Sequence, residues 1–216
     1  MKIRYNGHSC FSIFAADGTC VVCDPYETGA YGGAVGYLPV DSKPDVVTIS
    51  HEHPDHNFTK CFSGEFTVMR QPGTAKGIRF DVVSADHDGE GGSQRGKVRM
   101  FDFTVDGIRV CHAADLGHVL TPEQAAALAG VDVLLLPVGG FYTIDAHEAT
   151  DVVETLRPRV VIPMHYKTDK CGFTIAPVDD FLAGKGNVKR IDTDEIELFA
   201  DRLPGETEIL VLKHRL

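Results

Sequence analysis

The chain has 216 residues, of which 43% are hydrophobic and 24% are charged, and its formal net charge is −10. These are the proportions of an ordinary globular protein, and we expect a single domain over residues 1–216. The negative charge disfavours binding to a nucleic-acid backbone, and no apolar run approaches the roughly 18 residues of a membrane span. No signal peptide is recognisable, so a cytoplasmic location is expected.

The six cysteines are too few for a disulfide scaffold in a chain of this length. Cys20 and Cys23 form one CxxC pair, but Val21 and Val22 between them are typical of a strand. No second pair completes a zinc ribbon. We therefore expect reduced thiols with a structural role.

The N-terminal part of the chain has the pattern of short strands. Up to about residue 49, apolar runs alternate with Gly, Asp and Pro turns, as they do in antiparallel sheets. Asp45–Ser50 is predicted as a buried strand that runs directly into His51. Phe80–Ser84 is predicted as another strand, ending shortly before His87. Each strand thus leads to a histidine.

A hairpin and a helix are predicted next along the chain. The strands Val98–Val105 and Ile108–His112 flank Asp106-Gly107, which suits a type I′ turn because both positions require positive φ. Thr121–Gln124 supplies an N-cap, a first-turn proline and a glutamine at N3. A helix should therefore continue from there to about Ala129.

A parallel pair of strands with a helical crossover follows. Val131–Leu136 is predicted as a strand, Ala146–Leu156 as a helix that ends before Pro158, and Val160–Ile162 as the next strand. A strand, a helix and a strand in this order imply a right-handed crossover between parallel neighbours. We expect a further helix and two strands at Pro177–Leu182, Ile196–Phe199 and Ile209–Leu212.

Polar residues fall directly after the predicted strands. They are His51, His87, Asp115, Gly139-Gly140 and His165. Ligands bind outside the carboxyl ends of strands in sheets with parallel pairs, because the loops there converge on one crevice. These positions are therefore expected to share one site.

Four potential metal ligands occur within the segment His51-Glu-His-Pro-Asp-His56. A turn allows side chains spaced two and four positions apart to point inward together. Imidazole and carboxylate groups form a ligand set that suits zinc, iron or manganese. A solvated polar loop is the alternative interpretation, but such a loop rarely holds three histidines and one aspartate in this register.

One turn does not complete two coordination spheres, so further ligands should come from elsewhere in the chain. The histidines near strand ends are His87, His112, His118, His147 and His165. A lone histidine after a strand is more often a surface or hydrogen-bonded residue. We interpret His112 and His147 in that way, whereas His87 and His165 gain support because the first cluster needs partners.

The segment His51-x-His53-x-Asp55-His56 resembles the HxHxDH signature of the metallo-β-lactamase superfamily, and later positions resemble its other motifs in order. The resemblance implies an α/β fold, a four-layer αββα sandwich of two mixed β-sheets flanked by helices. It also implies two triads of ligands and one bridging carboxylate: His51, His53 and His87; Asp55, His56 and His165; and Asp115. Ala114 stands where a glycine usually precedes the bridging aspartate.

Two further segments, Asp115–Thr121 and Pro137–Asp145, resemble a compact prokaryotic branch of these hydrolases. That branch is similar to ascorbate-6-phosphate lactonases and to phospholipase D enzymes that act on N-acyl-phosphatidylethanolamines. His53 occupies the position of a glutamate in the flavodiiron proteins, and the chain is too short for their flavodoxin domain. Both features argue against the oxygen-reducing members.

The resemblance implies two divalent metal ions per chain, with zinc expected first and iron or manganese as alternatives. Two such ions would lower the pKa of a bridging water to about 7 and polarise a carbonyl or phosphoryl oxygen. Asp55 would orient the resulting hydroxide. His118 is a candidate leaving-group acid, and a hydrogen bond at the start of a helix is its alternative role.

Weaker candidates surround this set. Asp24 either fixes the tautomer of a ligating histidine or is a turn residue before Pro25. His8 and Tyr142 are possible pocket residues. Arg95 lies in the glycine-rich segment Asp88–Lys97, which resembles a mobile loop beside the site. Arg95 could meet an anionic group of the substrate, and a solvated loop is the simpler interpretation.

The leading functional hypothesis is hydrolysis of an ester, lactone or phosphodiester in a small-molecule substrate. A metal-dependent nuclease is one alternative, and a non-hydrolytic iron-binding protein is another. Only about 30 residues separate His56 from His87. That spacing leaves little room for a covering insertion, so we expect a pocket that is open or completed by another subunit of a homo-oligomer.

Overall fold

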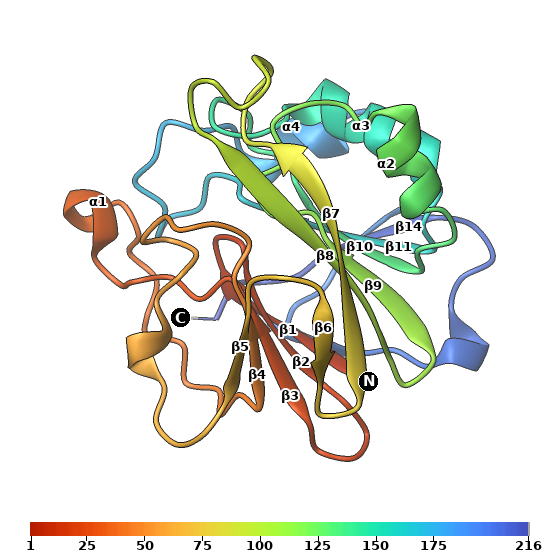
Figure 1. Ribbon diagram of the computed structural model, residues 1–216. Helices are drawn as coiled ribbons and strands as arrows, with labels where there is room; N and C mark the ends of the chain where they lie inside the picture. The colour runs from red at the N-terminus through yellow and green to blue at the C-terminus, as the bar shows by residue number, and fades with distance from the viewer. Residues whose placement is uncertain (216) are drawn as a thin grey trace.

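The computed structural model describes residues 1–215 and contains two mixed β-sheets packed face to face (Figure 1). The six-stranded sheet consists, in spatial order, of β13 (Glu195–Glu197), β1 (Lys2–Gly7), β2 (Cys10–Phe14), β3 (Cys20–Cys23), β4 (Val46–Thr48) and β5 (Thr67–Met69). The eight-stranded sheet consists, likewise, of β12 (Val188–Arg190), β14 (Glu208–Val211), β11 (Val160–Met164), β10 (Val133–Pro137), β9 (Ile108–His112), β8 (Lys97–Val105), β7 (Ile78–Asp86) and β6 (Gly73–Ala75).

The strands that lead to polar residues run in one direction within each sheet. In the first sheet, β1 and β3 are both antiparallel to β2, and β4 is parallel to β3. In the second sheet, β7 and β9 are both antiparallel to β8, and β10 and β11 continue parallel to β9. The carboxyl ends of these strands therefore gather at one edge of each sheet, where loops can converge.

The alternation of side chains along the strands produces two hydrophobic clusters. In β3, Val21 and Cys23 belong to the large core that joins the two sheets, whereas Cys20 and Val22 belong to a smaller core on the outer face. All six cysteines of the described chain are free thiols, and five of them are buried. Both members of the CxxC pair thus pack in a strand, as expected for structural thiols.

Three helices cover the outer face of the eight-stranded sheet (Figure 1). They are α2 (Pro122–Ala127), α3 (Ala146–Leu156) and α4 (Val178–Leu182). Helix α3 buries Ala149, Val152 and Leu156, the spacing of one helical face. Capping boxes begin α2 at Thr121 and α3 at Asp145. None of the described helices is long and apolar enough to cross a membrane.

The outer layer over the six-stranded sheet is thin. Its helical elements are α1 (Ala30–Gly33), which is interrupted by left-handed backbone at Tyr31 and Gly32, and the 3₁₀ turn η1 (Thr59–Cys61). The rest of the layer is loop, anchored by the buried side chains of Tyr26 and Tyr37. The expected αββα sandwich of two mixed sheets is confirmed. Most of its helical residues lie over the eight-stranded sheet.

Most predicted elements are confirmed with small shifts of their ends. The hairpin turn has positive φ at Asp106 and Gly107, and helix α3 has the predicted bounds. The crossover from β10 to β11 is parallel, as predicted. Helix α2 ends at Ala127, two positions before the predicted Ala129. The short strand β12 and the 3₁₀ turn η2 (Ala200–Arg202) were not predicted, because both are half-buried or exposed and carry no apolar run.

Gly139, which follows β10, provides a test of how the strand ends are packed. A Cβ at this position would lie 2.1 Å from the carbonyl oxygen of His165. The obstacle is backbone, so Gly139→Ala must displace the turn after β11, and we expect the free energy of unfolding to fall by about 1–3 kcal/mol. Urea unfolding followed by circular dichroism measures the change.

Gly186→Ala is the matched control, because nothing lies within 4 Å of the Cβ that would be added there. Its free energy of unfolding should stay within about 0.5 kcal/mol of the native value. Equal unfolding midpoints for the two variants would contradict the packing argument.

Candidate metal centre

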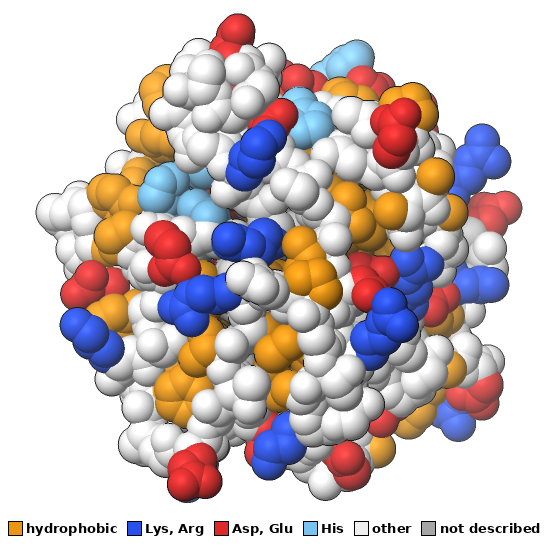
Figure 2. Space-filling view, in the orientation of Figure 1, with side chains coloured by type: hydrophobic (Ala, Val, Ile, Leu, Met, Phe, Trp, Pro, Cys, Tyr) orange, Lys and Arg blue, Asp and Glu red, His pale blue; other side chains and the backbone are white. Residues whose placement is uncertain are grey.

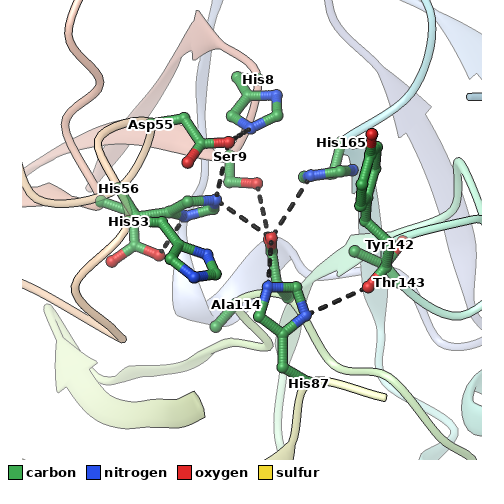
Figure 3. Close-up of polar contacts among 12 residues, drawn as sticks. His8, Ser9, His53, Asp55, His56, His87, Ala114, Tyr142, Thr143 and His165 are labelled. Atoms are coloured by element: carbon green, nitrogen blue, oxygen red, sulfur yellow. Dashed lines mark hydrogen bonds and ion pairs between the residues drawn. The ribbon is translucent and has the colours of Figure 1, made fainter. Parts of the chain in front are cut away.

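All seven predicted ligands converge at the carboxyl ends of the strands. His51 follows β4 and starts the turn that carries His53, Asp55 and His56; His87 follows β7, Asp115 follows β9 and His165 follows β11. Six of the seven side chains are buried, and His53 is half-buried. The two sheets thus contribute ligands from opposite sides of one crevice (Figure 3).

The histidines form two groups, and the carboxylate of Asp115 lies between them. The ring nitrogens of His51, His53 and His87 lie within 4.8 Å of one another. A second group with the same spacing comprises His8, Asp55, His56 and His165.

Asp115 Oδ2 is 3.1 Å from His56 Nε2, 3.4 Å from His87 Nε2 and 3.4 Å from His165 Nε2 (Figure 3). One carboxylate oxygen therefore contacts members of both groups. This is the position that a bridging ligand would occupy.

Burial sets the charge of the histidines. Burial, together with the positive charge of His56, lowers the pKa of His51 to about 3, so its ring is neutral at neutral pH and keeps a free lone pair. Burial also lowers the pKa of His87. For His56 burial would lower the pKa, but the carboxylates of Asp115 and Asp55 outweigh it and raise the pKa well above its ordinary value. The carboxylates therefore stabilise positive charge at the centre.

Several buried polar atoms of the site have no hydrogen-bond partner within the described residues. Four of them belong to the second group, namely Asp55 Oδ1, His56 Nε2, His8 Nδ1 and His165 Nδ1. Each unsatisfied buried atom costs about 1–3 kcal/mol. Imidazole nitrogens and carboxylate oxygens at this spacing fit a divalent cation, which would supply the missing partner for Asp55 and His56.

A second layer of hydrogen bonds fixes the ring orientations. Asp24 Oδ2 accepts a hydrogen bond of 2.9 Å from His56 Nδ1–H and one of 2.5 Å from the hydroxyl of Ser50. The Ser50 oxygen in turn lies 2.8 Å from His51 Nδ1, from which it accepts the proton. Both rings are thereby held with Nε2 facing the centre. The structure supports the interpretation of Asp24 as the hydrogen-bond partner of a candidate ligand, His56, over that of a turn residue before Pro25.

The charge of Asp24 is maintained despite complete burial. Burial would raise the pKa of this carboxyl, but the hydrogen bond from His56 and the nearby imidazole of His112 lower it below its ordinary value. Its other oxygen, Oδ1, accepts the backbone N–H of Ser50 at 2.8 Å. Ser50 was not recognised from the sequence, because a serine before a histidine has no distinctive signal.

His8, a weak candidate in the sequence, lies inside the site. Its Nε2 is 2.9 Å from Asp55 Oδ2, and its ring centroid is 4.3 Å from that of His165. Burial, with a contribution from His165, lowers the pKa of His8 to about 4. The neutral ring therefore donates Nε2–H to Asp55. Ser9, the next residue, contacts Asp115 through its hydroxyl at 3.5 Å and was not predicted.

His118 does not face the crevice. Its Nε2 accepts the backbone N–H of Asp86 at 3.1 Å, and its Nδ1–H donates to the carbonyl of Val119 at 2.8 Å. Both ring nitrogens are therefore occupied by backbone, and the expectation of a leaving-group acid at His118 finds no support in this geometry. His112 bonds the carbonyl of Ser9 at 2.7 Å, and His147 is exposed; both fit their structural interpretation.

A small cavity of about 190 Å³ opens above the ligands. Its floor is formed by five of the candidate ligands, namely His53, Asp55, His87, Asp115 and His165. Its rim is formed by Tyr31, Arg95, Tyr142 and Phe173. Histidine side chains reach the surface beside hydrophobic ones on the face shown in Figure 2. The rim residues border the crevice, and the expectation of a pocket that is open or completed by another subunit stays a prediction.

A larger open groove of about 1170 Å³ lies elsewhere, between the loop near Leu38 and the last residues of the described chain. The charged side chains in it are paired with one another or with neighbours: Arg215 bonds Asp41 and His214 bonds Asp169. Because these charges satisfy one another within residues 1–215, the smaller cavity with the candidate ligands is the stronger candidate site.

Known proteins resemble this chain in sequence and in fold. A protein from Thermotoga maritima, assigned to the Zn-dependent hydrolases of the metallo-β-lactamase superfamily, is 38% identical, with a TM-score of 0.81 and 99% of each chain covered. A UPF0173 metal-dependent hydrolase from Pyrobaculum arsenaticum is 31% identical over 78% of this chain and 85% of its own length. Its counterpart from Thermoplasma acidophilum is 29% identical over 78% and 84%.

The sequence profile described as the β-lactamase superfamily domain matches residues 2–165. This range contains all seven candidate ligands and the strands that carry them. The likeness to the Thermotoga protein extends the match over nearly the whole chain. The chain therefore belongs to the metallo-β-lactamase superfamily.

Proposed function

We propose that this protein is a metal-dependent hydrolase that holds two divalent cations, with zinc the first expectation, and cleaves an ester, lactone or phosphodiester bond of a small molecule. The observation that carries the proposal is the Asp115 carboxylate placed between two groups of buried histidines. The relatives named metal-dependent hydrolases support the reaction class. Bond type and metal are our inference from the ligand chemistry.

The residues divide between two positions. His51, His53 and His87 would hold one cation, Asp55, His56 and His165 the second, and Asp115 both. Bound there, the cations would lower the pKa of a water molecule and polarise the substrate oxygen. The protein's own part begins with Asp24 and Ser50, which keep the ring nitrogens aimed at the centre.

Asp55 is the candidate for proton handling. Burial would raise the pKa of its carboxyl, but the charge of His56 and the hydrogen bond from His8 lower it below its ordinary value, so Asp55 is ionised. One oxygen is held by His8 while the other is unpaired, and the residue lines the cavity. Because His118 faces away, Asp55 is also the group that can return a proton to the leaving group.

The cavity supports a small substrate over a nucleic acid. It has a volume of about 190 Å³, and Arg95 is the one Lys or Arg side chain that lines it within residues 1–215. A nuclease needs a series of basic groups along the phosphate backbone. The alternative of a nuclease is therefore not favoured.

The variant His53→Ala tests the metal-dependent reaction. Loss of one ligand should lower metal content and abolish hydrolysis together, whereas His147→Ala, at an exposed position, should leave both unchanged. Mass spectrometry of bound metals and a panel of lactones, thioesters, phosphodiesters and β-lactams measure the two properties. Full activity with unchanged metal would refute the assignment, and a single redox-active iron per chain would favour a non-hydrolytic protein.

The variant Asp24→Asn tests the second layer. The Asp24 carboxylate accepts at both oxygens, one from the backbone N–H of Ser50 and the other from His56 and the Ser50 hydroxyl. An amide has one accepting oxygen, so its NH2 group would oppose a donor on one side, and we expect metal affinity to fall about 10- to 100-fold. Competition with a chromogenic chelator measures this affinity. Asp201→Asn, a change of the same charge at an exposed position, is the control. Equal affinities in the two variants would show that the buried network does not orient the ligands.

A further inference from the structure

We propose that the rim of the cavity recognises a substrate with an anionic oxygen group, a phosphate or a carboxylate, attached to an apolar body. Arg95 would bind the anion, and an aromatic arc formed by Tyr31, Phe141, Tyr142 and Phe173 would contact the apolar part. This inference rests on the proposed function, because it names the substrate class of the same site.

The charge of Arg95 is left available to a ligand. Its guanidinium lines the cavity, and within residues 1–215 it makes neither an ion pair nor a side-chain hydrogen bond. The acidic residues nearby in the sequence are engaged elsewhere: Asp86 pairs with Lys97 at 2.5 Å, and the Asp88 carboxylate accepts backbone N–H groups. A half-buried arginine without a carboxylate partner favours binding of an external anion.

The loop that carries Arg95 is fixed by Asp88. Oδ1 of this carboxylate accepts the N–H groups of Glu90 and Gly92, and Oδ2 accepts those of Gln94 and Arg95, at 2.8–2.9 Å. The loop also returns to the candidate ligand His87, whose N–H donates to the carbonyl of Gly96 at 2.9 Å. Hydrogen bonds thus hold the segment together and place the backbone of Arg95 relative to the candidate ligands.

The aromatic arc continues from Arg95 around the rim. The guanidinium carbon lies 5.4 Å from the centroid of the Tyr142 ring, within range of a cation–π contact. Centroid distances are 5.7 Å from Tyr142 to Phe173, 5.5 Å from Phe173 to Tyr31 and 4.7 Å from Tyr142 to Phe141. Tyr31, Tyr142 and Phe173 therefore line the cavity beside the cation, and Phe141 extends this aromatic surface beyond the rim through its contact with Tyr142.

Two members of the arc are exposed on unusual backbone. The exposed fraction is 52% for Tyr31 and 68% for Phe141, and their φ angles are 52° and 63°. Positive φ is rare for bulky residues and is retained where the surroundings impose it, often at ligand sites. Exposing aromatic rings to water is unfavourable for the free protein. A ligand that covers them therefore gains the hydrophobic free energy of removing them from water.

The charges of the cavity orient the substrate. The floor carries the carboxylates of Asp55 and Asp115, which bound cations would neutralise, and the rim carries the positive charge of Arg95. The scissile bond would thus lie at the floor, while a second, anionic group would lie at the rim.

Titration calorimetry of the metal-loaded protein with phenylphosphonate, phenylacetate and neutral benzyl alcohol tests the inference. We expect at least one of the two anions to bind more tightly than the alcohol. Arg95→Gln should weaken binding of that anion about tenfold and leave benzyl alcohol unchanged, because it removes one charge-assisted hydrogen-bonding group. Arg95→Lys should restore part of the affinity. Arg202→Gln, the same charge change at an exposed position, should have no effect.

The probes also separate the possible anions. A loss confined to phenylphosphonate assigns a phosphoryl group to the substrate, and one confined to phenylacetate assigns a carboxylate. Unchanged affinity of Arg95→Gln for both anions, or no binding of either to the native protein at millimolar concentration, overturns the inference. Anion binding that depends on Arg95 without hydrolysis of any substrate in the panel would refute the proposed function and leave the anion site standing.

Discussion

The contact on which the site depends is the placement of the Asp115 carboxylate among three imidazole nitrogens. Within 3.4 Å of one oxygen lie ring nitrogens of His56, His87 and His165, which come from both sheets. A buried carboxylate is expensive to desolvate unless positive charge compensates it. The carboxylates raise the pKa of His56, whose positive charge offsets part of this cost, and divalent cations would offset it more completely. The fold thus places carboxylates beside positively charged groups, and each compensates the desolvation of the other.

A layer of hydrogen bonds around the candidate ligands sets the orientation of their side chains. Asp24, Ser50 and His8 lie at the ends of β3, β4 and β1, and each bonds a candidate ligand. Their hydrogen bonds assign one nitrogen of His51 and of His56 to the scaffold and leave the other for the centre. Because these partners come from the six-stranded sheet, the orientation of the ligands is coupled to the pairing of its strands. The paired strands therefore fix the orientation of the ligand side chains.

The floor and the rim of the cavity have different physical origins. Floor residues lie in the turn after β4 or follow β7, β9 and β11, and all except the half-buried His53 are buried, so their positions are set by the sheets. Of the rim residues, Tyr31 lies in the short, interrupted helix α1, and the others lie on loops after β7, β10 and β11. The loop after β7 is held by Asp88. Conserving the strands while varying such loops changes what is bound without changing the chemistry at the floor. This division explains why the reaction class is easier to infer than the substrate.

The sequence by itself determined the elements and the ligand set. Local rules predicted the Asp106-Gly107 hairpin and helix α3, because turn and cap signals act over a few residues. The clustered motif at His51–His56 indicated the candidate metal centre, and strand ends indicated its distant candidate ligands. Only the tertiary structure showed that His118 turns to the backbone, that Ser50 and Ser9 join the site, and that Asp88 fixes the Arg95 loop. The contacts of His118, Ser50 and Ser9 join residues 32, 26 and 106 positions apart, which no local pattern encodes. The bonds of Asp88 are local, but an aspartate in a glycine-rich segment carries no distinctive signal for them.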